Sequence, residues 1–329
     1  MNGPAILLPT TGAWAQVREH AALADRLGYS AIYCSHISAR DSFTALTGLA
    51  DVAPHVGLGV AVAPIYHRSP ASMAQTAATV DDITGGRFRL GLGVGHRVTM
   101  ANWHGQEIGS PLAEMREYVA VVRALLAGEP ATGGRRWRST FSFGNFAPRP
   151  DLPIYLAGLS AAMVALAGEI ADGIVLWACP ASYVRDVVVP TAREARAAAG
   201  KDPDTFAIVA AVPSAATDDP ERAIDGMRGE LVRYFGLPFY RRMFAAAGYG
   251  RDIAAYDAAG SDAARRHAIG AEFIADLCAI GDARAVADGV ARYRAAGPVT
   301  PMISNIPGTA FIPTLHAAAP ERTARSAAS

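Results

Sequence analysis

The sequence predicts an α/β fold in the form of a single (β/α)8 TIM barrel. Short apolar runs alternate with helix-like segments along most of the chain. The runs are continuous rather than alternating, as expected for parallel strands that are buried on both faces. Eight such runs fit a closed barrel better than an open sheet. The length of 329 residues also suits one barrel domain.

In the first half of the chain, each expected strand leads through a turn into a helix. A helix begins near Pro70 and stops before Gly85 and Gly86, which provide the turn into the fourth strand. The segment 97–111 is interpreted as a loop. The expected strands span residues 5–9, 31–35, 57–63 and 88–92, and the expected helices span 14–27, 42–51, 70–83 and 112–127.

The second half repeats the plan, with two interruptions. Segment 128–150 is predicted to be an extended loop or hairpin, and segment 228–279 a helical insertion after the seventh strand that covers the barrel mouth. We expect one domain over residues 1–316 and a flexible tail over 317–329. The remaining strands are expected at 154–157, 174–177, 206–212 and 301–306, and the helices at 161–171, 181–199 and 283–296.

The composition argues against several classes of partner. Lys plus Arg and Asp plus Glu each total 30, so we expect neither nucleic acid nor a membrane surface as a partner. We expect no signal peptide, and no apolar run is long enough for a membrane span. Cys34, Cys179 and Cys278 are far apart and odd in number, which favours a reducing cytoplasm. No cluster has metal-ligand spacing, so no metal is predicted.

Glycines mark the end of the fourth strand, where barrels place their ligands. Gly91, Gly93 and Gly95 alternate there, and glycine lets a backbone approach a flat ring or a phosphate closely. His96 occupies the place of the final glycine of GxGxxG, so this is not a dinucleotide fingerprint. The pattern indicates either a cofactor-facing loop or a tight turn of the barrel.

A second candidate site is the turn from the fifth strand into its helix, formed by Gly158, Leu159 and Ser160. Ser160 suits an N-cap position, and the free N–H groups behind it suit a phosphate. An ordinary capped helix is the alternative interpretation.

His36 ends the second strand, a position where barrel enzymes carry catalytic residues. A histidine there is a core residue, a donor to a substrate, or a proton carrier with a pKa near neutrality. Other large side chains at or after strand ends either line an apolar substrate pocket or pack under loops. They are Tyr66, Trp103, Trp177 and Met302.

Several motifs together resemble the bacterial-luciferase-like superfamily of flavin- and deazaflavin-dependent oxidoreductases. The motifs stand in the family's order and cover most of the chain: GYSAIYCSH, VGLGVAVAP, TAATVDDITGGRFRLGLGVGH, NWHG, PIYLAGLSAAMVALAGEIADGIVLW and GDARAVADGVARYRAAGPVTPMI. The forms NWHG and PIYLAGLSAAM are most similar to the branch that uses the deazaflavin coenzyme F420. The resemblance implies a barrel that holds F420, or else FMN, at its strand ends.

The resemblance also implies which residues bind the cofactor. A non-proline cis peptide is expected between Val60 and Ala61, supporting the face of the ring, and the turn after the fifth strand approaches the phosphate-bearing tail. Ser160 departs from a glycine that is common in the family. The expected cofactor-binding residues are Val60, Ala61, Ala63, Gly93, Val94, Gly95, His96, Gly158, Leu159 and Ser160.

His36 is the expected catalytic residue, as the source of the proton that accompanies hydride transfer. The family often has an aspartate immediately before this histidine, where this chain has Ser35. That departure removes a carboxylate and weakens an inherited acid–base scheme. The alternative proton carriers are His67, His96 and His104.

The expected function is therefore hydride transfer between F420 and a small organic substrate. One alternative is a two-component monooxygenase that uses reduced FMN and oxygen. Another is a non-catalytic barrel that binds a flavin or simply dimerises, which Ser35 would favour. Selectivity is expected to lie in segments 97–111, 128–150 and 228–279, and the resemblance implies a homodimer. The arginine clusters in the two irregular segments are either solvated or steer an anionic cofactor tail.

Overall fold

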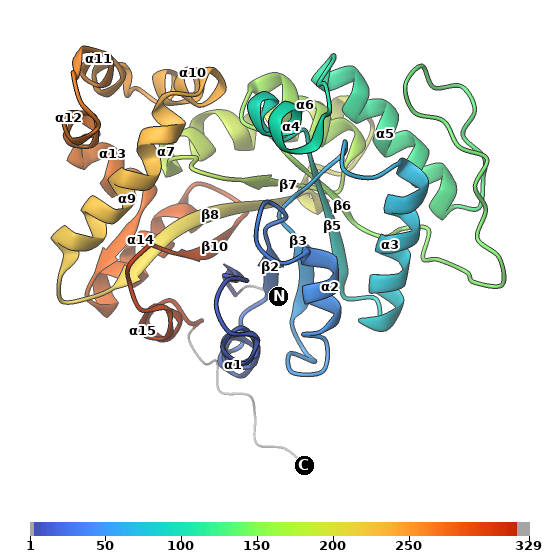
Figure 1. Cartoon of the computed structure of the whole chain (residues 1–329), viewed down its shortest axis with the longest axis horizontal. Helices are drawn as coiled ribbons and strands as arrows, with labels where there is room; N and C mark the ends of the chain where they lie inside the picture. The colour runs from blue at the N-terminus through green and yellow to red at the C-terminus, as the bar shows by residue number, and fades with distance from the viewer. Residues whose placement is uncertain (1–2, 321–329) are drawn as a thin grey trace.

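A computed structural model describes residues 3–320, and in that part of the chain eight parallel strands close into a barrel (Figure 1). The last of them, β10, pairs with both β1 and β8, which completes the ring. The (β/α)8 prediction is confirmed. The barrel strands are β1 (Ala5–Leu7), β2 (Ala31–Cys34), β3 (Gly57–Val60), β5 (Phe88–Gly93), β6 (Ile154–Ala157), β7 (Gly173–Leu176), β8 (Ala207–Ala216) and β10 (Val299–Asn305).

Side chains of the strands alternate between two cores. Outward-facing residues such as Ile6, Ile32 and Leu90 are fully buried against the surrounding helices. Burial of one such aliphatic side chain contributes about 1.5–3 kcal/mol. A separate cluster fills the barrel interior, and its buried members are Ala5, Ala31, Tyr33, Tyr155, Val175, Val209, Ala211 and Met302.

The helices that surround the barrel begin at residues suited to that position. Asp41, Ser69 and Ser160 each accept a hydrogen bond from a backbone N–H in the first turn of the following helix. These helices are α1 (Trp14–Leu27), α2 (Ser42–Thr47), α3 (Pro70–Ile83), α5 (Pro111–Leu126), α6 (Ala161–Ile170), α7 (Ala181–Tyr183), α8 (Val189–Ala198), α14 (Ala283–Ala295) and α15 (Phe311–Ala317), with a π-helical turn at Val184–Val188 joining α7 to α8.

The predicted third strand divides into β3 and a short β4 (Ala63–Pro64). The register against β5 shifts by one residue between the two pieces, so the chain bulges there. The cis peptide joins Ala61 to Val62, not Val60 to Ala61 as predicted. The backbone N–H of Ala61 still donates to the Cys34 carbonyl at 2.9 Å, so the departure from the strand falls one peptide later.

The helical insertion after β8 is present and lies to one side of the barrel (Figure 1, left). It begins with α9 at Pro220 rather than at Arg228. Rings of Phe235, Phe244 and Phe273 form its centre, with centroids 4.7–5.2 Å apart. Its elements are α9 (Pro220–Phe235), α10 (Pro238–Ala246), α11 (Gly250–Ala258), α12 (Asp262–Ala268), α13 (Ala271–Leu277) and a short strand, β9 (Ala279–Gly281), that pairs with β8.

The other irregular segments differ in how well the structure matches the prediction. The presumed loop 97–111 contains a helix, α4 (Arg97–His104), which the sequence analysis missed. Segment 128–150 is extended, with one antiparallel bridge between Ala131 and Ser139. At the C-terminal end, Ala318 is still buried, and the part of the expected tail from residue 321 onward lies outside the described residues.

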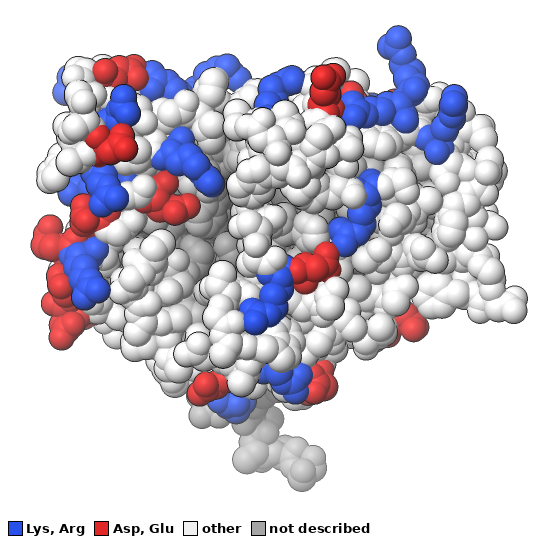
Figure 2. Space-filling view, viewed as in Figure 1, with Lys and Arg blue, Asp and Glu red and all other residues white. Residues whose placement is uncertain are grey.

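Charged side chains are spread in both signs over the molecule. Figure 2 shows basic and acidic residues interspersed over the insertion at the left and in a diagonal row near the middle of that face. Over residues 3–320, no helix is both long enough and apolar enough to cross a membrane.

Candidate active site

A cavity of about 370 Å³ opens beyond the carboxyl ends of β2 and β4. Its walls come from the loop after β2, the turn after β4 and the C-terminal part of α4. This is the end of a parallel barrel at which ligands bind. All of the lining side chains are polar or aromatic: His36, Tyr66, His67, Arg68, His104 and Gln106.

His36 lies in this cavity with its side chain 12% exposed. Its Nδ1 is 2.9 Å from the Ser42 hydroxyl, and its Nε2 is 3.3 Å from Nη1 of Arg68. Burial lowers the pKa of His36, Asp41 opposes this, and Arg68 and His104 reinforce it. The imidazole is therefore neutral at neutral pH, so it can accept a proton there.

Two further histidines stand beside His36. The rings of His67 and His104 are 3.9 Å apart, and the ring of His67 is 5.5 Å from that of His36. Burial, and then the neighbouring His104, His36 and Arg68, lowers the pKa of His67 to about 4. Nε2 of His67 is buried with no hydrogen-bond partner, so it is available to a ligand.

Tyr66 forms another wall and is fixed from behind. Its hydroxyl donates to Glu114 at 2.5 Å, and Glu114 also accepts from Arg136 at 2.9 Å. The Arg136 guanidinium lies 4.9 Å from the centre of the Tyr66 ring. Segment 128–150, which carries Arg136, therefore contacts a wall of the cavity from behind.

The glycines of β5 make room for the bulge after β3. A Cβ on Gly91 would lie 1.9 Å from the Val60 carbonyl oxygen, and one on Gly93 would lie 2.6 Å from Cγ2 of Val62. These glycines therefore face the bulge, and Val62 occupies the space in front of Gly93. Val62 was not among the predicted site residues, because the bulge cannot be located without the register of the strands.

Some of the buried polar atoms without a partner lie at the carboxyl ends of the strands. Besides Nε2 of His67, they include Nε1 of Trp177, just after β7, and Oγ of Ser304, near the end of β10. Ser304 follows Met302 by two residues, so it points to the barrel interior one layer higher. Buried polar groups normally have partners, so these atoms fit the donors and acceptors of a bound ligand.

The turn after β6 has the capped geometry that was predicted. Oγ of Ser160 accepts from the backbone N–H of Met163 at 3.2 Å, and the Leu159 carbonyl accepts from the Tyr183 hydroxyl at 2.7 Å. Gly158 is buried, and a Cβ there would meet Cγ of Met163 at 2.8 Å. The N-terminus of α6 can receive an anion, while Gly158 is needed for packing against its own helix.

The sequence profile of the luciferase-like monooxygenase family matches residues 2–300 of the chain. The chain belongs to this family. The luciferase-like chain is 29% identical over 309 residues to a putative coenzyme F420-dependent oxidoreductase of Mycobacterium tuberculosis, covering 87% of this chain and 89% of that protein. Family membership makes it an oxidoreductase.

Solved structures share the fold of the luciferase-like chain. The coenzyme F420-dependent tetrahydromethanopterin reductase of Methanopyrus kandleri superposes with a TM-score of 0.79, 21% identity and 96% coverage of each chain. The oxygenating constituent of 3,6-diketocamphane monooxygenase of Pseudomonas putida, in complex with FMN, superposes with a TM-score of 0.69, 18% identity and coverage of 97% and 96%. At these identities the likeness concerns the fold.

Some predicted site residues of the luciferase-like chain lie apart from the cavity. Met302 is 1% exposed and lies in the interior barrel layer, below the strand ends. Its depth could not be predicted, because the two-residue period of a strand shows which face a residue is on but not how deep it lies. Trp103 is 58% exposed on α4. The ring of Trp177 lies 6.2 Å from that of Tyr234 on α9, and so faces the insertion.

Residues after β5 also turn toward the insertion. The ring of His96 is 5.9 Å from that of Tyr240 on α10, and burial, followed by Arg233, lowers the pKa of His96. Val94 is half-buried, and Gly95 adopts φ +68°, a conformation that favours glycine. His96 thus lies apart from the cluster of His36, His67 and His104.

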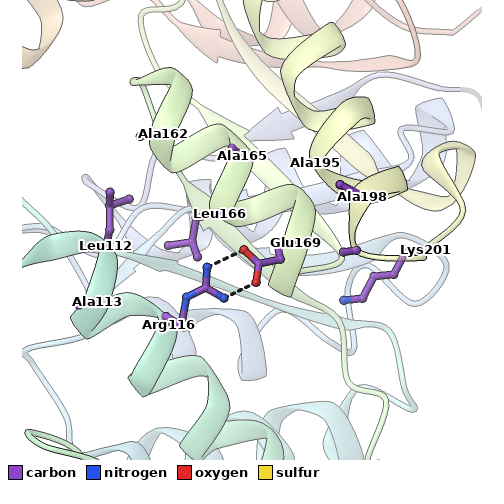
Figure 3. Close-up of a pocket in the computed structure, with 11 residues that line it drawn as sticks. Leu112, Ala113, Arg116, Ala162, Ala165, Leu166, Glu169, Ala195, Ala198 and Lys201 are labelled. Carbon is purple, nitrogen blue, oxygen red and sulfur yellow. Dashed lines mark hydrogen bonds and ion pairs between the residues drawn. The ribbon is translucent and has the colours of Figure 1, made fainter.

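A larger concave region of the luciferase-like chain, about 740 Å³, lies on the outside of the barrel between α5, α6 and α8 (Figure 3). Its walls are mainly alanine methyl groups. Its main charged groups, Arg116 and Glu169, already pair through both carboxylate oxygens. No strand end opens into it, so it lacks the features of the active site. In the described part of the chain, no group of three potential ligands could hold a metal ion.

Proposed function

We propose that this protein transfers a hydride between coenzyme F420 and a small organic substrate. The main support is the neutral, half-buried His36 in a polar cavity at the carboxyl end of β2, in a chain of the luciferase-like family. The F420-dependent relative of Mycobacterium tuberculosis, which matches most of the chain, favours the deazaflavin. A soluble cytoplasmic homodimer belongs to the same proposal.

The residues at the strand ends fit a flat, polar cofactor. Ala61 and Val62 present the bulge against which a ring would lie, and the buried Oγ of Ser304 offers a hydrogen bond. Ser160 and the N-terminus of α6 would receive the phosphate of the tail. A bound deazaflavin supplies the carbon that gives or takes the hydride.

The chain itself contributes orientation, exclusion of water and a group that exchanges a proton. Nε2 of His36 faces the cavity and is the atom that exchanges this proton with the substrate. The other cavity walls, Tyr66 and Gln106, hold the substrate's polar groups. The absence of an aspartate at position 35 is compensated by Asp41, which lies 3.8 Å from Nδ1 of His36.

FMN-dependent oxygen chemistry is the second candidate, because a structure with the same fold binds FMN. A non-catalytic flavin-binding barrel is less well supported, since the half-buried His36 and the unpartnered Nε2 of His67 and Oγ of Ser304 lie at the same end of the barrel.

A binding measurement tests the cofactor. The cofactor-free protein is titrated with F420 and, separately, with FMN, and binding is followed by fluorescence quenching. We expect the dissociation constant for F420 to be at least tenfold lower than for FMN, or about 1.4 kcal/mol. Tighter binding of FMN would replace F420 in this proposal.

A further inference from the structure

His36 lies between two charges of opposite sign. Oδ2 of Asp41 is 3.8 Å from Nδ1 of the ring, and Nη1 of Arg68 is 3.3 Å from Nε2. The two charged residues also bind each other, because Nη2 of Arg68 donates to Oδ2 of Asp41 at 2.8 Å. The carboxylate and the guanidinium therefore act on opposite nitrogens of one ring.

This arrangement selects one tautomer of the neutral ring. Arginine only donates hydrogen bonds, so the nitrogen facing Arg68 must carry the lone pair. A carboxylate only accepts, so it favours a proton on Nδ1, which then donates to the Ser42 hydroxyl at 2.9 Å. The backbone N–H of Ser42 favours the other tautomer, but it is 3.4 Å away and carries no net charge.

We propose that Asp41 and Arg68 are positioning residues that hold the proton of His36 on Nδ1 and leave Nε2 unprotonated toward the cavity. The inference rests on the proposed role of His36 as the proton carrier. In this state, Nε2 of His36 is a proton acceptor and can take a proton from a substrate. Arg68 makes two polar contacts, and the one from Nη1 to His36 is the weaker. A substrate can therefore replace that contact while Arg68 stays bound to Asp41.

The two positioning residues are themselves held in place. Oδ1 of Asp41 accepts from the backbone N–H of Thr44 at 2.9 Å as the N-cap of α2. The guanidinium of Arg68 lies 4.7 Å from the centre of the Phe43 ring, and its backbone carbonyl accepts from the Tyr118 hydroxyl at 2.9 Å. The charges thus keep fixed positions relative to the imidazole, as electrostatic preorganisation requires.

Removal of each charge has an opposite, predictable effect on the histidine. The titratable or charged groups around His36 are Asp41, Arg68, His67 and His104, with Tyr66 across the cavity. Loss of the Asp41 carboxylate removes a group that stabilises the imidazolium, so the pKa of His36 falls. Loss of the Arg68 cation removes a group that opposes the imidazolium, so the pKa rises.

The test uses the cofactor-free protein, so its outcome does not depend on which cofactor or substrate is correct. Proton–nitrogen correlation spectra report the protonated nitrogen of each histidine, and the signals of His36 are identified by their loss in His36→Gln. We expect Nδ1–H in the wild type. Asp41→Asn, which can still cap α2, should lower the pKa of His36 by about 0.5–1 unit, and Arg68→Met should raise it by a similar amount.

Arg68→Lys keeps the positive charge and provides a second variant at this position, with an expected pKa close to that of the wild type. Asp186→Asn, an exposed ion-pair residue between α7 and α8, is the control and should change neither tautomer nor pKa. Thermal unfolding confirms that each variant is folded. An Nε2–H tautomer in the wild type overturns the inference. The inference is also overturned if Asp41→Asn does not lower the pKa of His36, or if a folded variant without the Arg68 charge does not raise it.

Discussion

His36→Gln is expected to lower turnover by about 10²- to 10⁴-fold, the contribution typical of a positioned general acid or base. Glutamine fills much of the same space and can still bond to Ser42, but it cannot exchange a proton near neutral pH. Cofactor affinity should change little, because the contacts of His36 are with the chain's own polar residues. Steady-state turnover and a separate cofactor titration measure the two effects.

The pH profile gives a second test of His36. The neutral ring of His36 is the proposed proton acceptor, and its pKa is lowered from the ordinary histidine value of about 6.5. Activity in the direction that oxidises the substrate should therefore fall only below about pH 6.5. His55→Gln, at an exposed histidine paired with Asp25, is the matched control. Wild-type turnover and an unchanged profile in His36→Gln would make His36 a packing residue.

Gly91→Ala is expected to destabilise the fold by about 3 kcal/mol, at the upper end of the usual cost of overpacking. The new methyl carbon would lie 1.9 Å from the carbonyl oxygen of Val60 and 2.9 Å from Cγ1 of Val62. The first of these atoms is backbone, so it cannot rotate away. The bulge after β3 must move, and with it the surface that is proposed to support the cofactor ring.

Thermal unfolding of the cofactor-free protein measures this effect without any assumption about activity. Gly144→Ala is the control, since a Cβ at that position meets nothing within 4 Å. Equal melting temperatures for the two variants would mean that β5 has room for a side chain, and that the bulge is not held by Gly91.

The barrel could be predicted because its strands carry a local signal. A parallel strand buried on both faces is a continuous apolar run, and glycine, proline and serine mark most helix ends. Helix α4 ends at Gly105, its C-cap, but it lacked an apolar periodicity, because it exposes Val98 and Trp103 and buries only Met100. The division of the third strand also escaped prediction, since a bulge depends on register with β5 rather than on local sequence.

The candidate site was predictable in part. The carboxyl end of a strand is readable, so His36 was identified from the sequence, and the cap at Ser160 from its place before a helix. Asp41 and Arg68 were missed because an ion pair between two loops leaves no pattern in the sequence. The depth of Met302 in the barrel could not be predicted, because it depends on the stagger between strands.

An anaerobic single-turnover assay tests the proposed direct hydride transfer from a deazaflavin. Reduced F420 carrying deuterium at the hydride-donating carbon is mixed with the enzyme and a substrate found by screening. We expect turnover without oxygen and one deuterium bonded to carbon in the product. Turnover only with reduced FMN and oxygen, with an oxygen atom from O₂ in the product, would contradict it.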